Sequence, residues 1–432
     1  MRSGLSGRFI TGDGGRGLSK MAFPNTVSAN LPGQFYQPTG SINRYMVNVD
    51  FGGLFHMMKS IDFGVTWAEV DAAHAPTQGG IDRSSCTDGS IIFSVSSDVT
   101  DGNVMISTFS MLTDLWIGTT VTANLIANSP NEAVIQVGYR AVDKKLVILG
   151  PVDAFKVGAT FRVGYFLFDT VALTWGAWVK CGDTAASNFD GDSFGVVPGT
   201  GFMHLFMMSI PHPGLGETVV SVIQQSLSDA NALGALQTVD SAAPVGGPTE
   251  NWFACSDGAT VVVMWEPDST ADATLFKIFQ GASASTITFA SSTLHAPAAQ
   301  LIATIVCARS ALAGTYAFVC WQDATFTFTS FGYFLNAGSG YGTLQTFGSL
   351  IVSPGPSAIA FASTLTNGGK WGVTMQGSAF YWEPAPAITV LGAPPVRPPQ
   401  LIVLPRRAMC CIPLRGRCKD GRLMLRGKVI YS

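Results

Sequence analysis

The sequence has little charge. Asp, Glu, Lys and Arg make up 12% of its 432 residues, about half of what soluble globular domains average, whereas apolar residues reach 47%. Glycine is abundant, with 48 residues. Helical proteins are rich in Lys, Glu and Leu, so this composition favours short strands and tight turns over helices.

Membrane and secretion signals are also missing. The longest apolar-leaning stretch, residues 297–308, is interrupted by Gln300 and is too short to span a bilayer. The N-terminus has no apolar run of the signal-peptide kind, and no Asn-x-Ser/Thr sequon occurs. We therefore expect an unprocessed protein without a membrane span, made in the cytoplasm of a bacterial host or retained there.

No motif predicts a cofactor, a metal site or a catalytic group. The five histidines (56, 74, 204, 212 and 295) are dispersed, with none at i, i+4 spacing or near a cysteine pair. The cysteines of the main part of the chain lie in strand-like runs such as residues 305–307, which is typical of free thiols in a core. A disulfide network is the alternative.

Strand signals recur along the chain and are separated by turn sequences such as Asp101-Gly102 and Asp257-Gly258. We expect strands at residues 44–48, 91–97, 103–110, 134–140, 161–168, 202–209, 218–224, 260–266, 274–279, 315–322, 325–334 and 371–376. They group into about seven units of 40–55 residues, which predicts a β-propeller with seven blades, or six. Tandem β-sandwiches are the alternative architecture.

Net charge divides the chain. Residues 394–432 hold nine basic residues and one acidic residue, Asp420, which leaves 16 basic and 27 acidic residues in 1–393. A proline-rich hinge opens the basic part. We expect an N-terminal irregular arm (1–40), a propeller body (41–390) and a Pro-hinged basic C-terminal extension (391–432).

One motif carries a family resemblance. Ser60-Ile61-Asp62-Phe63-Gly64-Val65-Thr66-Trp67 fits S-x-D-x-G-x-T-W and resembles the Asp box of sialidase-like (BNR-repeat) propellers. Ser60, Asp62, Gly64, Thr66 and Trp67 would fold a hairpin between the two outer strands of a blade, with Gly supplying a positive φ and Trp packing beneath the turn. Residues 169–175 and 112–116 are degenerate copies. A chance hairpin is the alternative interpretation.

The resemblance implies a blade and not an activity. Sialidases have an arginine triad and an early strand similar to Phe-Arg-Ile-Pro, whereas residues 43–46 read Asn-Arg-Tyr-Met. Arg44 is the nearest candidate for that family's arginines, and the motif that identifies a sialidase is absent. We expect no enzyme activity, and a glycan-binding or glycan-hydrolysing propeller is the alternative.

The basic extension predicts partner docking. Its apolar runs (401–404, 423–425 and 429–431) look like strands that could pair with a neighbour's sheet edge. Nucleic-acid binding is a less favoured alternative, and Cys410, Cys411 and Cys418 leave open a crosslink or shared metal between subunits. The basic residues expected to dock are Arg406, Arg407, Arg415, Arg417, Lys419, Arg422, Arg426 and Lys428.

Composition and layout together resemble those of bacteriophage virion proteins, especially tail or head-fibre components. That resemblance implies a non-enzymatic structural subunit that forms a homo-oligomer and docks on other protein subunits. Its place would be the virion, with a cytoplasmic scaffold as the alternative.

Overall fold

The computed structural model of the chain describes residues 19–22, 32–38, 41–49, 55–61, 67–76, 83–97, 103–122, 135–157, 160–182, 189–209, 219–242, 252–267, 274–297, 300–310, 314–323, 328–351, 361–365, 370–375, 379–384, 418–419, 422–425 and 428–430. The chain divides into two compact units, residues 1–387 and 388–432. Each unit is considered by itself.

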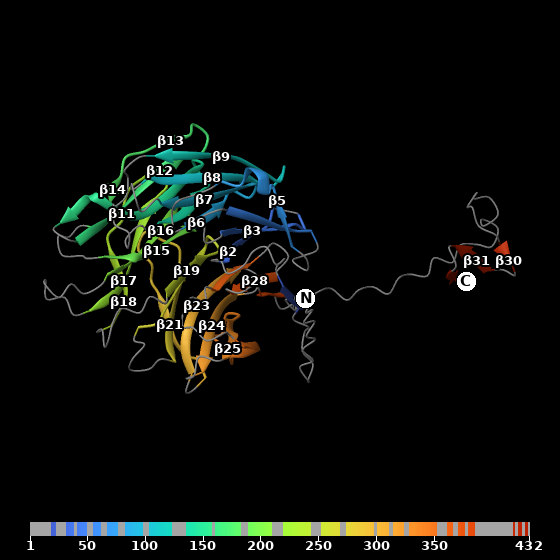
Figure 1. The fold of residues 1–432 in the computed structure, drawn as a ribbon. Coiled ribbons are helices and arrows are strands. Elements are labelled where there is room, and N and C mark those ends of the chain that lie inside the picture. The colour runs from blue at the N-terminus through green and yellow to red at the C-terminus, as the bar shows by residue number, and fades with distance from the viewer. Residues whose placement is uncertain are drawn as a thin grey trace, which may run out of the picture. The chain divides into compact units, whose positions relative to one another are not determined.

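The first unit consists of antiparallel sheets (Figure 1). Its described strands form seven of them, which we number as blades. Blade 1 holds β2 (Pro32–Tyr36), β3 (Arg44–Val49), β4 (Phe55–Ser60) and β5 (Ala68–Val70), and is followed by the 3-10 helix η1 (Ala72–His74). Blade 2 holds β6 (Arg83–Thr87), β7 (Ile91–Ser97), β8 (Val104–Ser110) and β9 (Leu115–Thr122). Blade 3 holds β10 (Gln136–Arg140), β11 (Lys145–Val157), β12 (Thr160–Asp169), β13 (Thr174–Trp175) and β14 (Val179–Lys180).

The remaining four blades follow the same plan. Blade 4 holds β15 (Phe189–Gly199), β16 (Phe202–Ser209), β17 (Val220–Ser228) and β18 (Gln237–Ala242). Blade 5 holds β19 (Trp252–Ser256), β20 (Thr260–Trp265), β21 (Leu275–Ala282) and β22 (Ala290–His295). Blade 6 holds β23 (Gln300–Ser310), β24 (Gly314–Asp323), β25 (Phe328–Asn336) and β26 (Gln345–Ile351). Blade 7 holds β27 (Phe361–Leu365), β28 (Lys370–Met375), β29 (Ala379–Pro384) and β1 (Ser19–Ala22).

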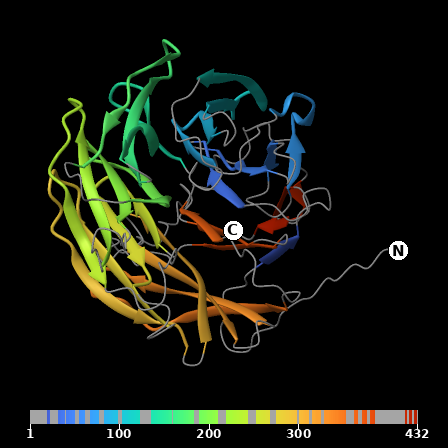
Figure 2. The same cartoon turned by 60° about the vertical axis from the view of Figure 1, so that its left-hand side comes forward.

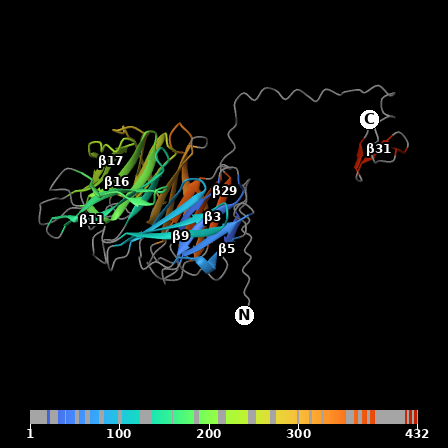
Figure 3. The same cartoon turned by 90° about the horizontal axis from the view of Figure 1, so that it is seen from above.

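The blades form a closed ring. The first strand of each blade contacts the first strand of the next, and β27 contacts β2. In Figure 2 the colour runs around the ring from blue through green and yellow to orange. Figure 3 shows β3, β5 and β29 on one side of the ring and β11, β16 and β17 on the other. The fold is a seven-bladed β-propeller, as the spacing of strand signals predicts, and this ring excludes tandem sandwiches.

The N-terminus completes the last blade. β1 pairs antiparallel with β29, with Ser19 opposite Trp382 and Ala22 opposite Ala379. Residues from the two ends of the body thus share one sheet, which fastens the ring non-covalently. This differs from the arm expected over residues 1–40, because β1 and β2 are both strands of the ring.

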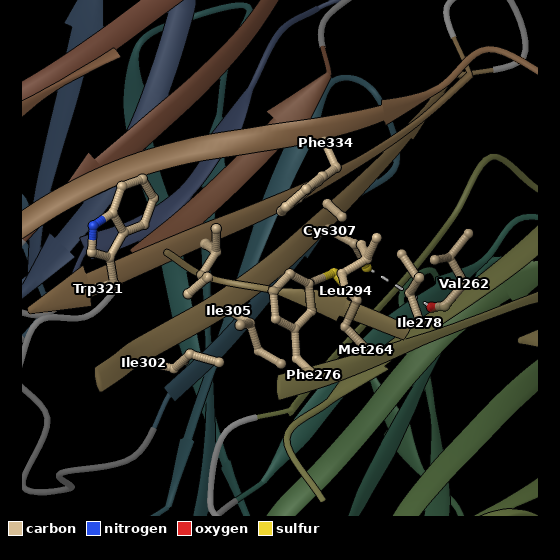
Figure 4. Packing of buried hydrophobic residues seen from close by; sticks show 13 residues of the cluster. Val262, Met264, Phe276, Ile278, Leu294, Ile302, Ile305, Cys307, Trp321 and Phe334 are labelled. Carbon is tan, nitrogen blue, oxygen red and sulfur yellow. Dashed lines mark hydrogen bonds between the residues drawn. The ribbon is translucent and has the colours of Figure 1, made fainter. Parts of the chain in front are cut away.

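The core consists of hydrophobic clusters between neighbouring blades. Strand β20 contributes side chains to two of these clusters. Val261 and Val263 belong to the cluster between blades 4 and 5. Val262 and Met264 point the other way, into the cluster between blades 5 and 6 (Figure 4). Successive side chains alternate between faces, so a strand buried on both faces must be apolar throughout.

The described cysteines are free thiols. Cys181, Cys307 and Cys320 are buried, whereas Cys86 and Cys255 are partly buried. Burial raises the pKa of the Cys181 thiol and of Cys320, so these groups are protonated at neutral pH. The expectation of core thiols is confirmed for these five residues.

The second unit contains one small described sheet. It is formed by β30 (Cys418–Lys419), β31 (Arg422–Leu425) and β32 (Lys428–Ile430) in that order. Of the strand-like runs expected in the basic extension, residues 423–425 lie in β31 and residues 429–430 in β32, whereas residues 401–404 and 431 lie outside the described residues.

Candidate interaction face

One end of the ring carries two connections from each of blades 1–6, whereas the fourth strand of blade 7, β1, comes from the N-terminal part of the chain. In an antiparallel meander, the turn between strands one and two and the turn between strands three and four emerge at the same end. We call this end the turn face. Among the described residues, it holds the Asp-Gly turns at 88–89 and 257–258 and the inter-blade ion pairs Lys59–Asp114 and Arg309–Asp257.

The Asp-box candidate lies on the turn face. Ser60 ends β4 and Trp67 precedes β5, so the motif spans the turn between strands three and four of blade 1. Both of these residues are buried, with Trp67 exposing 7% of its area. Asp62, Gly64 and Thr66 lie outside the described residues.

The two degenerate copies occupy the equivalent turns of blades 2 and 3. Residues 112–116 join β8 to β9, and residues 169–175 join β12 to β13. Trp116 packs edge-on against Phe109, with ring centres 5.3 Å apart, and Trp175 lies 4.6 Å from Phe168. Asp169 accepts hydrogen bonds from the amides of residues 172 and 171, at 2.8 and 2.9 Å, which hold the pKa of its carboxyl below the ordinary value.

A charged cluster joins blade 1 to the turn of blade 2. The carboxylate of Asp114 lies 2.7 Å from the hydroxyl of Tyr45 and 2.5 Å from Nζ of Lys59. Asp114 has a positive φ of 59°, which turns its side chain back toward blade 1. Burial, together with the Asp114 carboxylate, raises the pKa of Tyr45, so its hydroxyl is a permanent donor.

A second cluster joins blade 3 to blade 4. Arg140, which exposes 2% of its area, binds Asp143 through two bonds of 2.8 and 2.6 Å. It also donates to Oδ1 of Asn231 at 2.7 Å, in the turn between strands three and four of blade 4. Partial burial alone would raise the pKa of Asp143, but its interactions with Arg140 and Lys145 together outweigh burial and hold the pKa below its usual value.

A third cluster joins blade 5 to blade 6. Arg309 donates to Asp257 at 3.0 Å and to Thr315 at 3.2 Å. Asp257 also accepts the amide of Thr260 at 2.7 Å, and Asp88 accepts the amide of Ile91 in the same way in blade 2. The two Asp-Gly turns are therefore built alike, with positive φ at the glycine in both.

An uncharged polar network lies between blades 4 and 5. Nδ1 of the buried His204 accepts from the amide of Gln224 at 3.1 Å, and its Nε2 lies 2.9 Å from the hydroxyl of Ser283. Burial lowers the pKa of His204 to about 4, so the ring is neutral at pH 7. A Cβ on Gly199 would collide with both His204 and Ser283, so this network needs glycine there.

The described arginine and glutamates that a glycosidase could use, Arg44, Glu69 and Glu266, are buried or contact other residues of this chain. Arg44 is fully buried and donates to the carbonyl of Ile42 at 2.9 Å, and burial lowers its pKa to about 10. Glu69 lies 2.7 Å from His56, and Glu266 is buried. Glu132, Glu217 and Glu250 lie outside the described residues. No group of three or more His, Cys, Asp or Glu that could bind a metal occurs in the described part of the chain.

The basic extension is described through its strands alone. Lys419 pairs with Arg422 in register between β30 and β31, and Lys428 pairs with Leu425 between β31 and β32. The other basic residues expected to dock, Arg406, Arg407, Arg415, Arg417 and Arg426, lie outside the described residues.

Sequence reasoning missed an exposed apolar set on the turn face. Six aliphatic side chains there expose between 49% and 76% of their area. All lie in turns of blades 1–3: Ile42, Ile61, Leu112, Val142, Val171 and Leu173. We call them the aliphatic patch. At the turn face, the described turn residues of blades 4–6 include no exposed large apolar side chain; Val219, which is 41% exposed, lies at the opposite end of blade 4, and residues 311–313 of blade 6 lie outside the described residues.

Comparison with known proteins finds distant structural similarity only. No family model matches the chain, and no curated protein matches it. Among solved structures, Semaphorin 1a from Drosophila shares 8% identity at a TM-score of 0.48, covering 84% of this chain and 87% of that one. The α-L-arabinanase of Penicillium chrysogenum, solved with arabinobiose, shares 12% at 0.45, covering 84% and 96%. The Dos1 propeller shares 10% at 0.44, covering 81% and 76%.

These proteins differ in what their descriptions say they do, and identities this low carry no function across. No helix in the described ranges is long and apolar enough to cross a membrane.

Proposed function

We propose that the chain is a non-catalytic structural subunit of a larger protein assembly, a bacteriophage particle, in which the basic extension docks on neighbouring subunits. The observation that carries this proposal is the division of charge. The body up to residue 393 has 16 basic and 27 acidic residues, and the remainder has nine basic residues and one acidic. Opposite net charges on two parts of one chain favour contacts between copies.

The extension also has the form of a docking element. β30 and β32 are the edge strands of a small sheet, and edge strands present unpaired backbone groups that pair with a partner's sheet. Leu423, Met424 and Leu425 in β31 make the extension more apolar than a purely solvated tail needs to be. Both features support docking on protein over a tail that remains in solvent.

The charged groups of the turn face are consistent with a structural role. Lys59, Arg140 and Arg309 each bind a carboxylate of this chain. An arginine that grips a substrate carboxylate would instead direct its guanidinium into an open site. A fluorogenic sialoside that the purified protein turns over, with turnover lost in a correctly folded Arg44→Ala variant, would overturn the non-catalytic proposal.

The docking proposal is tested on the full chain. Replacing the eight basic docking residues, Arg406 to Lys428, by glutamine should remove the association that depends on low salt, because screening weakens exposed charge contacts. Multi-angle light scattering at low and high NaCl measures this. A control replaces the exposed body residue Lys180 by glutamine. Equal masses for wild type and the extension variant at every salt concentration would overturn docking by the extension.

The particle proposal has its own test. Mass spectrometry of purified phage particles should find the chain as a stoichiometric component, with peptides from both the body and the extension. Recovery from the soluble host fraction alone, with none in particles, would contradict it.

A further inference from the structure

The aliphatic patch breaks the pattern of the ring. In blades 1–6 the four main strands follow one another in the same order. We therefore compare, in each blade, the residue two positions after the end of the third strand, in the turn that leads to the fourth strand. In blades 2 and 3 these are Leu112 and Val171, whereas blade 4 has Ala230. The fold therefore accepts a small residue where blades 2 and 3 carry large exposed ones.

Folding gains little from these side chains. Leu112 and Val171 expose 76% and 70% of their area. Apolar side chains that stay in water contribute nothing to the core, and a set of them on one side of one face marks an interaction site. A partner that covers them would remove them from water.

We infer that the patch is the contact between two copies of this chain, which meet through the turn faces of blades 1–3 in a two-fold symmetric dimer. This inference rests on the proposed role as an assembly subunit and assigns that subunit a first partner. A two-fold interface uses the same surface twice, so each patch faces its counterpart.

The area of the patch fits such a dimer. Six side chains, each about half to three-quarters exposed, present on the order of several hundred Å² of apolar surface, at or above the largest patch on a typical monomer. Each partner in a standard interface contributes about 800 Å². The six exposed side chains alone would supply a substantial share of that area.

The charges around the patch permit two copies to meet. Asp114 is bound to Lys59 at 2.5 Å, and Asp143 to Arg140 at 2.6 Å. Lys145 lies 3.4 Å from the same Asp143. Asp114 and Asp143 are thus bound by bases of the same copy, and the exposed Asp88 and Lys144 in neighbouring turns carry opposite charges, so these residues bring little net charge to a second face of the same kind. A dimer held by apolar contacts should also persist in high salt, unlike docking by the basic extension.

The test compares two variants of the full chain by sedimentation velocity. Leu112→Asp with Val171→Asp places two negative charges in the patch, and the control Ala230→Asp places one at the matched position of blade 4. We expect wild type and the control to be dimers in low and high salt. The double variant should sediment as a monomer, with a dissociation constant at least about 100-fold higher than that of wild type. Buried unpaired charge opposes association.

The other outcomes overturn the inference. A monomeric wild type in high salt would show that no apolar dimer exists, and a dimeric double variant would place the contact elsewhere. Loss of the dimer in the control as strongly as in the patch variant would show a general effect of charge. If high salt and the extension variant both dissociate the dimer while the patch variant remains a dimer, the contact lies in the extension. That result would overturn this inference and leave the proposed function standing.

Circular dichroism of each variant checks folding. The substituted positions are exposed, so all three chains should give the same spectrum.

Discussion

The turn faces of blades 1–3 and of blades 4–6 are built on the same strands and turns, yet they present different chemistry to solvent. Blades 1–3 expose Ile, Leu and Val, whereas blades 4–6 expose residues such as Thr200, Ala230 and Ser339. The blades of the second group are joined by buried polar contacts, including the neutral His204 network. The comparison indicates that the fold constrains the turn residues whose side chains pack between blades. The exposed turn residues can vary without a cost to the core.

The largest loss of folding stability is expected where blade 3 meets blade 4, the junction of the two regions. Arg140→Ala removes a buried guanidinium that binds Asp143 in blade 3 and Asn231 in blade 4. Breaking such a pair should lower the free energy of unfolding by about 3–5 kcal/mol, measured by urea denaturation.

The control for this variant is Lys145→Ala. Lys145 is a more exposed partner of the same carboxylate, at 3.4 Å, so its loss should cost less than about 1 kcal/mol. Equal losses for the two variants would mean that Arg140 does not join the blades.

The polar network of blades 4 and 5 predicts a pH dependence. The unfolded chain protonates His204 near pH 6.5, but the folded chain does so near pH 4. Between these values the unfolded state binds the extra proton, so the free energy of unfolding should fall as the pH falls through this window, by up to about 3 kcal/mol.

His204→Gln removes this titration. Its unfolding free energy, measured by urea denaturation at several pH values, should decline less between pH 6.5 and 4 than that of wild type. Parallel curves for the two chains would contradict a neutral buried imidazole.

A smaller effect is expected in blade 1. Tyr45→Phe keeps the ring packed against Phe109 but removes the hydroxyl that contacts Met111 and Asp114. The loss should be about 1–2 kcal/mol, read as a lower thermal midpoint. An unchanged midpoint would show that Lys59 alone suffices to hold Asp114.

The smallest effect on stability is expected in the patch itself. Leu112→Ser and the matched Ala230→Ser should each change the unfolding free energy of the monomer by less than about 0.5 kcal/mol, since both sites are exposed. A loss of more than about 2 kcal/mol for Leu112→Ser alone would show that the leucine belongs to the core.

The strands that the sequence predicts are nearly all the second and third strands of their blades. Residues 202–209 and 218–224, for example, correspond to β16 and β17. These strands lie in the middle of a sheet and pack on both of its faces, so they carry long apolar runs.

Inner and outer strands were harder to find. β6 reads Arg-Ser-Ser-Cys-Thr and β1 reads Ser-Lys-Met-Ala. Such strands lie at the edge of a sheet, where polar and small residues are accepted, and four residues show no periodicity.

The amino-acid sequence by itself determines the contrast in charge between body and extension, and it predicts an all-β chain of about seven units, with six blades or tandem sandwiches left open. Alternation of apolar residues and turn-forming pairs are local properties, so they can be read along the chain. The tertiary structure decided that β1 closes blade 7, that Arg140 joins blades 3 and 4, and that six aliphatic residues between positions 42 and 173 share one face. Each of these depends on which residues distant in sequence meet in space, and closing the ring is what brings them together.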